Sequence, residues 1–212
     1  MTKVLIADDH AIVRAGIRRL IDDHSSMEVT SEASDGKEVL KFVDDQTYDI
    51  IVLDINMPNL NGLDTLKELR NKQPNTPVLV LSMYPESQYA IRALRSGASG
   101  YLTKEAAPEN LIQAIEKIVN GGRYITPELA EQLAYALGSN EHKQENPHQI
   151  LSDREYQIMC AIASGKSVSE IGKELNLSVK TISTYRTRVF DKMGFENNAQ
   201  LTHYVIKNNL LL

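Results

Sequence analysis

The chain has 212 residues, of which 42% are hydrophobic, and a formal net charge of −5. This length suits one large domain or two small ones, and the apolar content predicts a packed core. No run approaches the roughly 18 apolar residues of a membrane-spanning helix, and the N-terminus lacks the pattern of a signal peptide. The single cysteine, Cys160, excludes an internal disulfide, so we expect a location in the reducing cytoplasm and no membrane partner.

Charge is distributed unevenly along the chain. Residues 1–149 contain 15 Lys and Arg against 22 Asp and Glu, whereas residues 150–212 contain 8 against 6. The first part therefore carries a net charge of −7 and the second part +2. We expect the two parts to have different partners, with the C-terminal part as the candidate for binding a polyanion.

The first part of the chain alternates short apolar runs with helical patterns. Each of five runs is strand-length and rich in Val, Ile or Leu: Lys3–Ala7, Glu28–Ala33, Asp49–Leu53, Pro77–Ser82 and Gly100–Thr103. Between and after these runs, apolar residues recur three or four positions apart, as in helices. Five strands interleaved with five helices predict an α/β fold, a doubly wound five-stranded parallel sheet with helices on both faces.

A change of pattern follows Gly121 and Gly122. Thr126 as N-cap and Pro127 in the first turn predict a sixth helix that ends near Gly138. Residues 138–149 have almost no apolar side chains and are interpreted as a flexible linker.

From residue 150 onward only helical patterns occur, which predicts a small all-α domain of about 60 residues. The predicted domains are residues 1–122, a linker helix and flexible linker at 123–149, and a helical domain at 150–212.

Polar residues stand at the carboxyl ends of four predicted strands, which is where doubly wound sheets bind ligands. Asp8 and Asp9 follow the first strand, Asp54 follows the third, Ser82 ends the fourth and Lys104 follows the fifth. A single aspartate in such a place is more often a helix cap or a solvated loop residue. Three carboxylates in one pocket require a cation such as Mg²⁺, and an ammonium with a hydroxyl suits phosphoryl oxygens. The set therefore predicts phosphoryl transfer to a carboxylate.

Other functions of this fold class lack their motifs in this chain. No Gly-x-Gly-x-x-Gly follows the first strand, and there is no Gly-x-x-x-x-Gly-Lys-Ser/Thr loop. Haloacid-dehalogenase-like phosphatases pair their phosphoacceptor with a second aspartate two residues on, where this chain has Asn56. These observations argue against dinucleotide binding, a P-loop and that class of phosphatase.

The segments VLIADDH, IVLDINMPNLNGL, VLVLSMY and GASGYLTKEA resemble the receiver domain of two-component response regulators over about residues 1–122. The resemblance implies a flavodoxin-like fold in which Asp54 is the phosphoacceptor. It also implies that Asp8, Asp9 and Asp54 bind Mg²⁺ together with the carbonyl of Asn56.

The same resemblance implies roles for three further residues. Ser82 and Lys104 would bind the phosphoryl oxygens, and Tyr101 would be the aromatic residue whose rotamer follows the hydroxyl. Glu105 stands where most such domains have a proline, which leaves the local backbone and any cis bond open. His10 could be a catalytic base, but we favour a residue at the rim of the pocket without acid–base chemistry.

The C-terminal part contains two sequence signatures of helix starts. Ser152–Glu155 and Ser167–Glu170 fit the capping box and predict helices that begin near residues 153 and 168. The second of these helices is expected to end near Asn176, and Ser178 can cap a third. A short helix, a turn of about four residues and another helix make helix-turn-helix spacing.

The third helix is predicted to be amphipathic, with an apolar stripe of Ile182, Tyr185, Val189 and Met193. The opposite face carries short hydroxyls and cations at Lys180, Ser183, Thr184, Thr187 and Arg188. Such a face suits the major groove of DNA, with phosphate contacts that position the helix and side chains that touch bases. A solvated helix surface is the alternative.

The run LSDREYQIMCAIASGKSVSEIGKELNLSVKTISTYRTRVFDKMG resembles the LuxR-type output domain, and with the receiver it resembles the NarL/FixJ family. Three residues are implied to face bases, namely Ser183, Thr184 and Thr187. Four are implied to lie nearer phosphates, namely Lys180, Thr181, Arg188 and Lys192. We expect Arg186 to reach a DNA phosphate or an internal carboxylate, and Asp191 to lie beyond the groove. The segments RAGIRRLI, RYITPELAEQLA and QLTHYVIKNNL also resemble the GacA/UvrY subgroup.

This resemblance implies a response regulator that is not an enzyme. A sensor histidine kinase would phosphorylate Asp54, and the phosphorylated homodimer would bind double-stranded promoter DNA at an inverted repeat. RNA polymerase is a further candidate partner. The apolar face of the last helix (Leu201, Tyr204, Val205 and Leu210) could form core or pair two output domains. Two alternatives stay open: an enzyme that hydrolyses phosphate esters at Asp54, and a protein-interaction module that binds no DNA.

Overall fold

The computed structural model describes residues 1–138, 147–208 and 210. The chain forms two compact units, Met1–Ala136 and Leu137–Leu212, and each is described by itself. Most of the segment that we interpreted as a flexible linker lies outside the described residues. Within the described part of the chain, no helix is long and apolar enough to cross a membrane.

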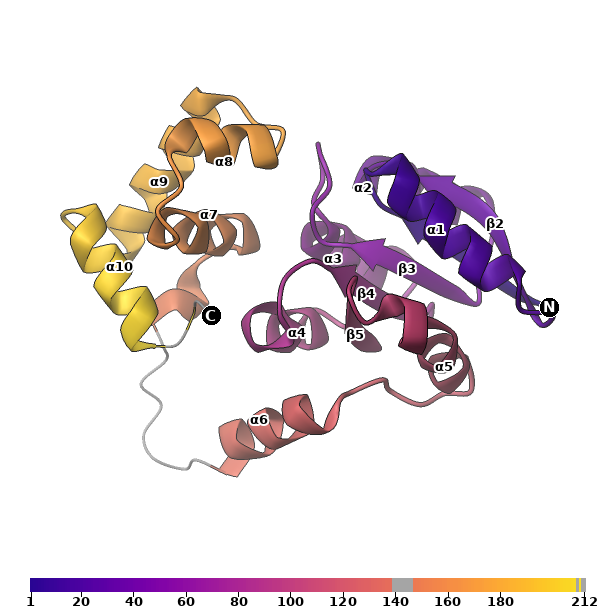
Figure 1. The fold of residues 1–212 in the computed structure, drawn as a ribbon. Coiled ribbons are helices and arrows are strands. Elements are labelled where there is room, and N and C mark those ends of the chain that lie inside the picture. The colour runs from indigo at the N-terminus through magenta and orange to yellow at the C-terminus, as the bar shows by residue number, and fades with distance from the viewer. Residues whose placement is uncertain (139–146, 209, 211–212) are drawn as a thin grey trace. The chain divides into compact units, whose positions relative to one another are not determined.

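The first unit is an α/β fold with an all-parallel sheet (Figure 1). Its strands are β1 (Thr2–Ala7), β2 (Met27–Ala33), β3 (Ile50–Asp54), β4 (Val78–Ser82) and β5 (Gly100–Thr103). Its helices are α1 (Ala11–Asp22), α2 (Gly36–Asp45), α3 (Gly62–Lys72), α4 (Glu86–Arg95), α5 (Ala107–Val119) and α6 (Pro127–Gly138). The predicted doubly wound five-stranded sheet is confirmed, and each strand end lies within one residue of its prediction.

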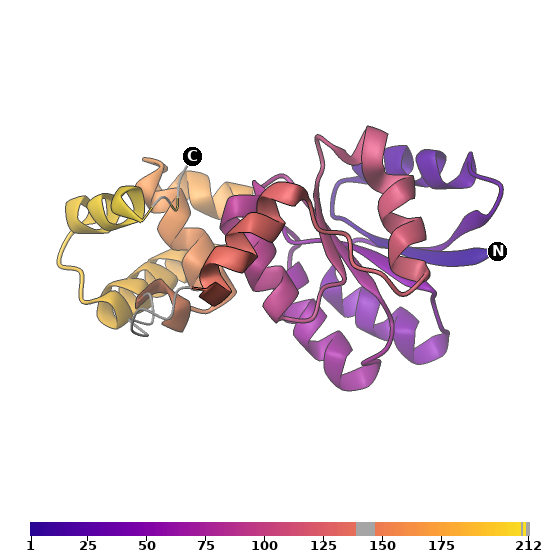
Figure 2. The same cartoon turned by 90° about the horizontal axis from the view of Figure 1, so that it is seen from below.

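The strand order is β2-β1-β3-β4-β5, so the direction of winding reverses between β1 and β3. Figure 2 shows the sheet between two helical layers, with α1 and α5 on one side and α2 and α3 on the other. Strands β3 and β4 are buried along their whole length, which explains why their sequences are apolar on both faces.

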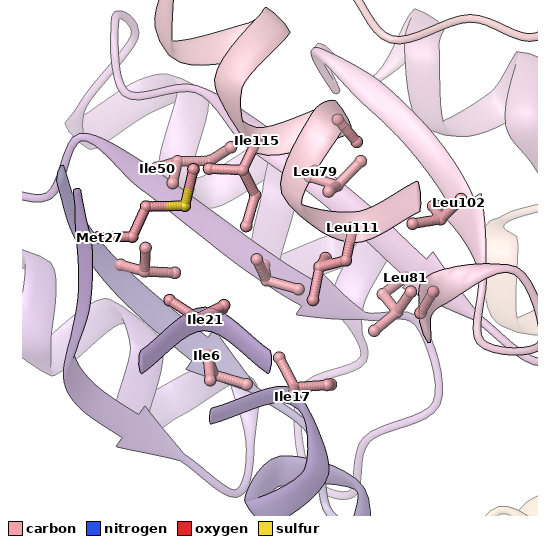
Figure 3. Packing of buried hydrophobic residues seen from close by; sticks show 14 of the residues in the cluster. Ile6, Ile17, Ile21, Met27, Ile50, Leu79, Leu81, Leu102, Leu111 and Ile115 are labelled. Atoms are coloured by element: carbon pink, nitrogen blue, oxygen red, sulfur yellow. The ribbon is translucent and has the colours of Figure 1, made fainter. Parts of the chain in front are cut away.

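The core beneath α1 and α5 is built from branched aliphatic side chains. Ile17 and Ile21 of α1, with Leu111 and Ile115 of α5, pack against the sheet residues of the same cluster (Figure 3). These sheet residues include Ile6, Ile50, Leu79, Leu81 and Leu102. The spacing of three and four positions on each helix produces one apolar face, as the sequence pattern predicted.

The second unit is entirely helical. A short 3₁₀ helix (Pro147–Ile150) precedes α7 (Asp153–Ala163), α8 (Val168–Glu174), α9 (Val179–Met193) and α10 (Asn198–Lys207). Both predicted capping boxes are present, at the starts of α7 and α8. Helix α8 ends two residues before Asn176, whose φ of 52° forms the turn, and Ser178 accepts a hydrogen bond from Thr181 N at the start of α9. The helix-turn-helix spacing is thus confirmed.

Ile6→Ala should lower the free energy of unfolding by about 2–5 kcal/mol, because it removes a fully buried side chain from a close-packed core. Ile12→Ala is the matched control, since Ile12 is 88% exposed. The control should change stability by no more than about 0.5 kcal/mol in urea unfolding followed by circular dichroism. An equal decrease in the free energy of unfolding for Ile6→Ala and Ile12→Ala would contradict this account of the core.

Candidate functional site

Parallel pairing brings the polar strand ends to one edge of the sheet. Ala7 pairs with Leu53, so that the next residues, Asp8 and Asp54, lie side by side on either side of the β1–β3 switch point. On the neighbouring strands, Ser82 pairs with Thr103, the residue before Lys104. The structure therefore places these strand-end residues where a doubly wound sheet binds ligands.

One ammonium group holds two buried carboxylates together. Lys104 Nζ lies 2.8 Å from Asp54 Oδ2 and 2.6 Å from Asp8 Oδ2. Both aspartates are only 1% exposed, so their mutual repulsion is poorly screened by water. Because one positive charge faces two negative charges, the site keeps a net negative charge and attracts a further cation.

The protonation equilibria of the site reflect this crowding. Burial raises the pKa of Asp54 to about 6, the Lys104 ammonium opposes this rise, and the Asp8 carboxylate adds to it. Burial acts to lower the pKa of Lys104, but Asp54 and Asp8 outweigh it, and the pKa is raised. At neutral pH most Asp54 side chains are therefore ionised, and Lys104 is charged.

The acidic cluster offers ligands for a metal ion. Asp8, Asp9, His10 and Asp54 each provide one ligand atom, and these atoms lie within 4.8 Å of one another. Asp54 Oδ1 is buried and has no hydrogen-bond partner within the described residues. A buried carboxylate oxygen without a partner is costly, and a hard cation would satisfy it. The cluster therefore fits a divalent cation with oxygen ligands.

His10 and Asn56 stand beside this cluster. The His10 side chain is 66% exposed, and its Nδ1 lies 2.6 Å from Asp9 Oδ1, which agrees with the interpretation of a rim residue. Asn56 Nδ2 donates to the Tyr84 hydroxyl at 3.4 Å. The role of the Asn56 carbonyl as a metal ligand stays a prediction.

Ser82 and Tyr101 are joined through the backbone of Tyr84. Tyr84 N donates to Ser82 Oγ at 3.1 Å, and the Tyr101 hydroxyl donates to Tyr84 O at 2.7 Å. Ser82 and Tyr101 are both fully buried, and burial raises the pKa of the Tyr101 phenol. The Ser82 hydroxyl at the end of β4 and the Tyr101 hydroxyl on β5 are thus both hydrogen-bonded to the backbone of Tyr84, in the loop after β4.

Two glycines that we did not single out from the sequence shape the loop after Asp54. A Cβ on Gly62 would lie 2.0 Å from the backbone oxygen of Asp54, and a Cβ on Gly36 would lie 2.7 Å from that of Leu60. The Asn61-Gly62 pair is a turn signal that could have located this loop. Close backbone contact therefore fixes the position of the strand end that carries Asp54.

The backbone between Lys104 and Glu105, which the sequence left open, is regular. All peptide bonds within the described residues are trans, including the bond between Lys104 and Glu105. Lys104 N donates to Ser82 O at 2.8 Å, which continues the β4–β5 ladder by one residue. Lys104 is thus held by the sheet itself.

Helix α9 has the two predicted faces. Ile182 and Val189 are buried, whereas Tyr185 and Met193 are partly buried. The hydroxyl and basic residues of the opposite face are all exposed, namely Lys180, Ser183, Thr184, Thr187 and Arg188. Thr181 is partly buried, and its hydroxyl lies 2.8 Å from that of the N-cap Ser178.

Two basic residues of α9 have internal partners. Lys192 Nζ lies 2.6 Å from Glu155 Oε2, in the capping box of α7. The Arg186 guanidinium donates to Asn198 Oδ1 at 3.0 Å and lies 4.5 Å from the ring centroid of Phe190. Among the described residues, the side-chain acceptor of Arg186 is thus an amide and not a carboxylate, and a DNA phosphate as its partner stays a prediction.

Comparison with known proteins assigns both units. Residues 4–116 match the family model "Response regulator receiver domain", and residues 149–205 match "Bacterial regulatory proteins, luxR family". The chain belongs to the response regulators. Response regulator UvrY of Escherichia coli K12 is 37% identical over 210 residues, which cover 99% of this chain and 96% of UvrY. Response regulator GacA of Pseudomonas aeruginosa PAO1 is 36% identical over 212 residues, with 100% and 98% covered.

Solved structures agree with this assignment. RcsB from Salmonella enterica serovar Typhimurium, bound to a promoter in the presence of the phosphomimetic BeF₃⁻, is 26% identical with a TM-score of 0.63. That match covers 97% of this response regulator and 99% of RcsB. A second RcsB structure, of two dimers bound to two parallel DNAs, is also 26% identical with a TM-score of 0.59, and 97% and 98% are covered. This response regulator therefore joins a receiver to a LuxR-type DNA-binding domain.

Asp54→Asn should raise the free energy of unfolding of this response regulator at pH 7, without added metal, by about 1–3 kcal/mol. The pKa of Asp54 is about 6 in the folded state, against about 4 in the unfolded chain. The folded state therefore binds more protons between these values, so the wild type loses stability as the pH rises from about 4 to about 6.

The Asp54→Asn variant lacks this loss. Plotted against pH, its free energy of unfolding and that of the wild type, both measured by urea unfolding, should therefore become equal near pH 4. Asp23→Asn, at an exposed position of the same unit, should follow the wild type at every pH. A less stable Asp54→Asn variant at pH 7 would contradict the assigned direction.

Proposed function

We propose that Asp54 accepts a phosphoryl group from a sensor histidine kinase and thereby controls dimerisation and binding of promoter DNA. The observation that carries this proposal is the Asp54 carboxylate at the switch point of the sheet, 2.8 Å from the Lys104 ammonium. Asp54 would be modified once in each signalling cycle and would not turn over free phosphate esters. Because bacterial chromosomal DNA lies in the cytoplasm, this function would place the protein there.

In the proposed transfer, a carboxylate oxygen of Asp54 attacks the phosphorus of a phosphohistidine. The new O–P bond forms as the N–P bond breaks, and the imidazole leaves with the electron pair of that bond. Lys104 and Ser82 would bind oxygens of the transferred group. Asp8, Asp9, Asp54 and the Asn56 carbonyl would hold Mg²⁺, which supplies positive charge against the carboxylates and the phosphoryl oxygens when bound.

We propose that the signal leaves the pocket through the loop between β4 and α4. A phosphoryl group that draws the Ser82 hydroxyl would disturb its hydrogen bond with Tyr84 N, and Tyr84 O anchors the Tyr101 hydroxyl. Glu86, at the start of α4, accepts a hydrogen bond from the Thr126 hydroxyl at 2.5 Å. Because Thr126 caps α6, a shift of this loop would reach the start of the linker helix.

We further propose the domain limits stated from the sequence: the receiver at 1–122, the linker helix and linker at 123–149, and the DNA-binding domain at 150–212. The two family matches support this division, since the first ends at residue 116, inside the receiver limits, and the second begins at residue 149, one residue before the proposed start of the DNA-binding domain. Within the second domain, Leu201 and Val205 are fully buried, which supports a core role for that face of α10. The exposed Ile206 is then a large apolar residue of α10 that is available for pairing in a homodimer.

For DNA we propose that α9 lies in the major groove. Ser183, Thr184 and Thr187 would face bases, whereas Lys180, Thr181, Arg188 and Lys192 would lie nearer phosphates. Lys192 would have to share its ammonium with Glu155. The match to promoter-bound RcsB supports DNA binding by this domain, and the RcsB dimers bound to DNA support binding as a homodimer, for which we propose an inverted-repeat site. RNA polymerase at the promoter is a further proposed partner.

Asp54→Asn should take no radioactive phosphate from a small acyl phosphate donor in the presence of Mg²⁺, because the amide cannot form the acyl phosphate. Asp23→Asn should be labelled like the wild type, and removal of Mg²⁺ with a chelator should abolish labelling of both. Undiminished labelling of Asp54→Asn would exclude Asp54 as the acceptor, and turnover of a generic phosphate ester would favour an enzyme.

Lys180→Ala should weaken the binding of specific and random duplexes to a similar extent, because a phosphate contact carries no sequence information. The slope of log K against log salt should fall in magnitude by about 1 per lost phosphate contact. Lys207→Ala, at the exposed end of α10, should leave the slope unchanged. A loss confined to the specific duplex would instead assign Lys180 to base recognition.

A further inference from the structure

We propose that Thr184 and Thr187 recognise thymine through their methyl groups and not through their hydroxyls. This inference rests on the proposed placement of α9 in the major groove. Contacts of these methyl groups with bases would give the two residues their preference for DNA sequence.

The hydroxyls of both threonines are already engaged by the helix itself. Thr184 Oγ1 donates to Lys180 O at 3.0 Å, and Thr187 Oγ1 donates to Ser183 O at 3.1 Å. A hydroxyl has one proton to donate, so neither side chain has a proton left for a base acceptor unless it breaks this bond. With Oγ1 directed at the helix backbone, the other branch of the side chain, the methyl group, is the part that remains for external contact.

The two methyl groups belong to one exposed strip of the helix. Both threonines are exposed, and residues three positions apart lie on the same side of a helix with their Cβ atoms about 5–6 Å apart. Ser183, between the basic residues Lys180 and Arg188, makes no side-chain hydrogen bond within the described residues. Ser183 therefore keeps a hydroxyl proton for a base, and the threonines offer apolar surface beside it.

In the major groove a methyl group has one specific counterpart. Thymine presents its C5 methyl there, whereas guanine, adenine and cytosine present polar atoms at the corresponding edges. A spacing of about 5–6 Å between Cβ atoms lies between one and two base steps of about 3.4 Å each. The preferred site should thus contain thymines one or two steps apart beneath Thr184 and Thr187.

The experiment compares thymine with uracil, which differ only by that methyl group. A duplex is first selected from a random-sequence pool by the full-length protein treated with a small phosphodonor and Mg²⁺. Each thymine of the selected duplex is then replaced by deoxyuridine, and affinities are measured for the wild type, Thr187→Val and Thr187→Ser. The valine variant keeps a methyl group and lacks the hydroxyl, whereas the serine variant keeps the hydroxyl and lacks the methyl. The same pair is made at Thr184.

For the wild type and the valine variant, one thymine-to-uracil exchange should weaken binding about fourfold, the effect of one buried methyl group. Each serine variant should bind the thymine duplex about fourfold more weakly and should become indifferent to the exchange of one thymine, the one beneath the substituted residue, while it stays sensitive to the other. Serine variants that keep the full set of exchange sensitivities of the wild type, or a wild type that is sensitive to no exchange, would overturn the inference while DNA recognition by α9 stands. A wild type that prefers no duplex over random DNA would overturn that proposed recognition as well.

Discussion

The ammonium of Lys104 between the Asp54 and Asp8 carboxylates is the interaction on which the rest of the receiver depends. Two buried carboxylates on adjacent strands repel each other strongly, and one internal cation reduces that repulsion without cancelling it. The remaining negative charge attracts a divalent cation, whereas burial, with a smaller contribution from the Asp8 carboxylate, keeps the pKa of Asp54 raised. The charges that make this pocket costly for folding would also serve the proposed phosphorylation. The carboxylates would bind the cation, and the Lys104 ammonium would bind phosphoryl oxygens.

The surrounding structure holds this arrangement from two directions. Register in the parallel sheet fixes the four strand ends, and Gly36 and Gly62 allow the loop after β3 to pack against backbone atoms near Asp54. On the other side, Tyr84 in the loop after β4 connects the buried Ser82 to Tyr101 through two hydrogen bonds of its backbone. The first set of contacts is rigid backbone packing, whereas the second consists of hydrogen bonds that a bound phosphoryl group could exchange for its own. In the proposed signalling route, the loop after β4 would therefore be the part of the site that moves.

Much of this site could be predicted because parallel strands place their carboxyl ends together, so Asp8, Asp54, Ser82 and Lys104 could be grouped from the sequence alone. Capping residues located the helix starts of the second unit for a similar, local reason. Contacts between elements distant in the chain could not be predicted in this way. The partners of Lys192 and Arg186 depend on how α7, α9 and α10 pack, and the link from Glu86 to Thr126 depends on the path of the chain after α5.

The chain after α5 has a further consequence for the behaviour of the receiver on its own. Tyr124 forms a parallel bridge with Gly100, and Tyr124 N donates to Ser99 O at 3.1 Å, so this segment extends the sheet beyond β5. A bare edge strand presents unpaired backbone groups on which other chains can pair and aggregate. The beginning of the linker therefore covers the Gly100 end of the β5 edge and shields that end from pairing with other chains. A receiver fragment cut at residue 122 would lose that shield, and one that retains Tyr124 would keep it.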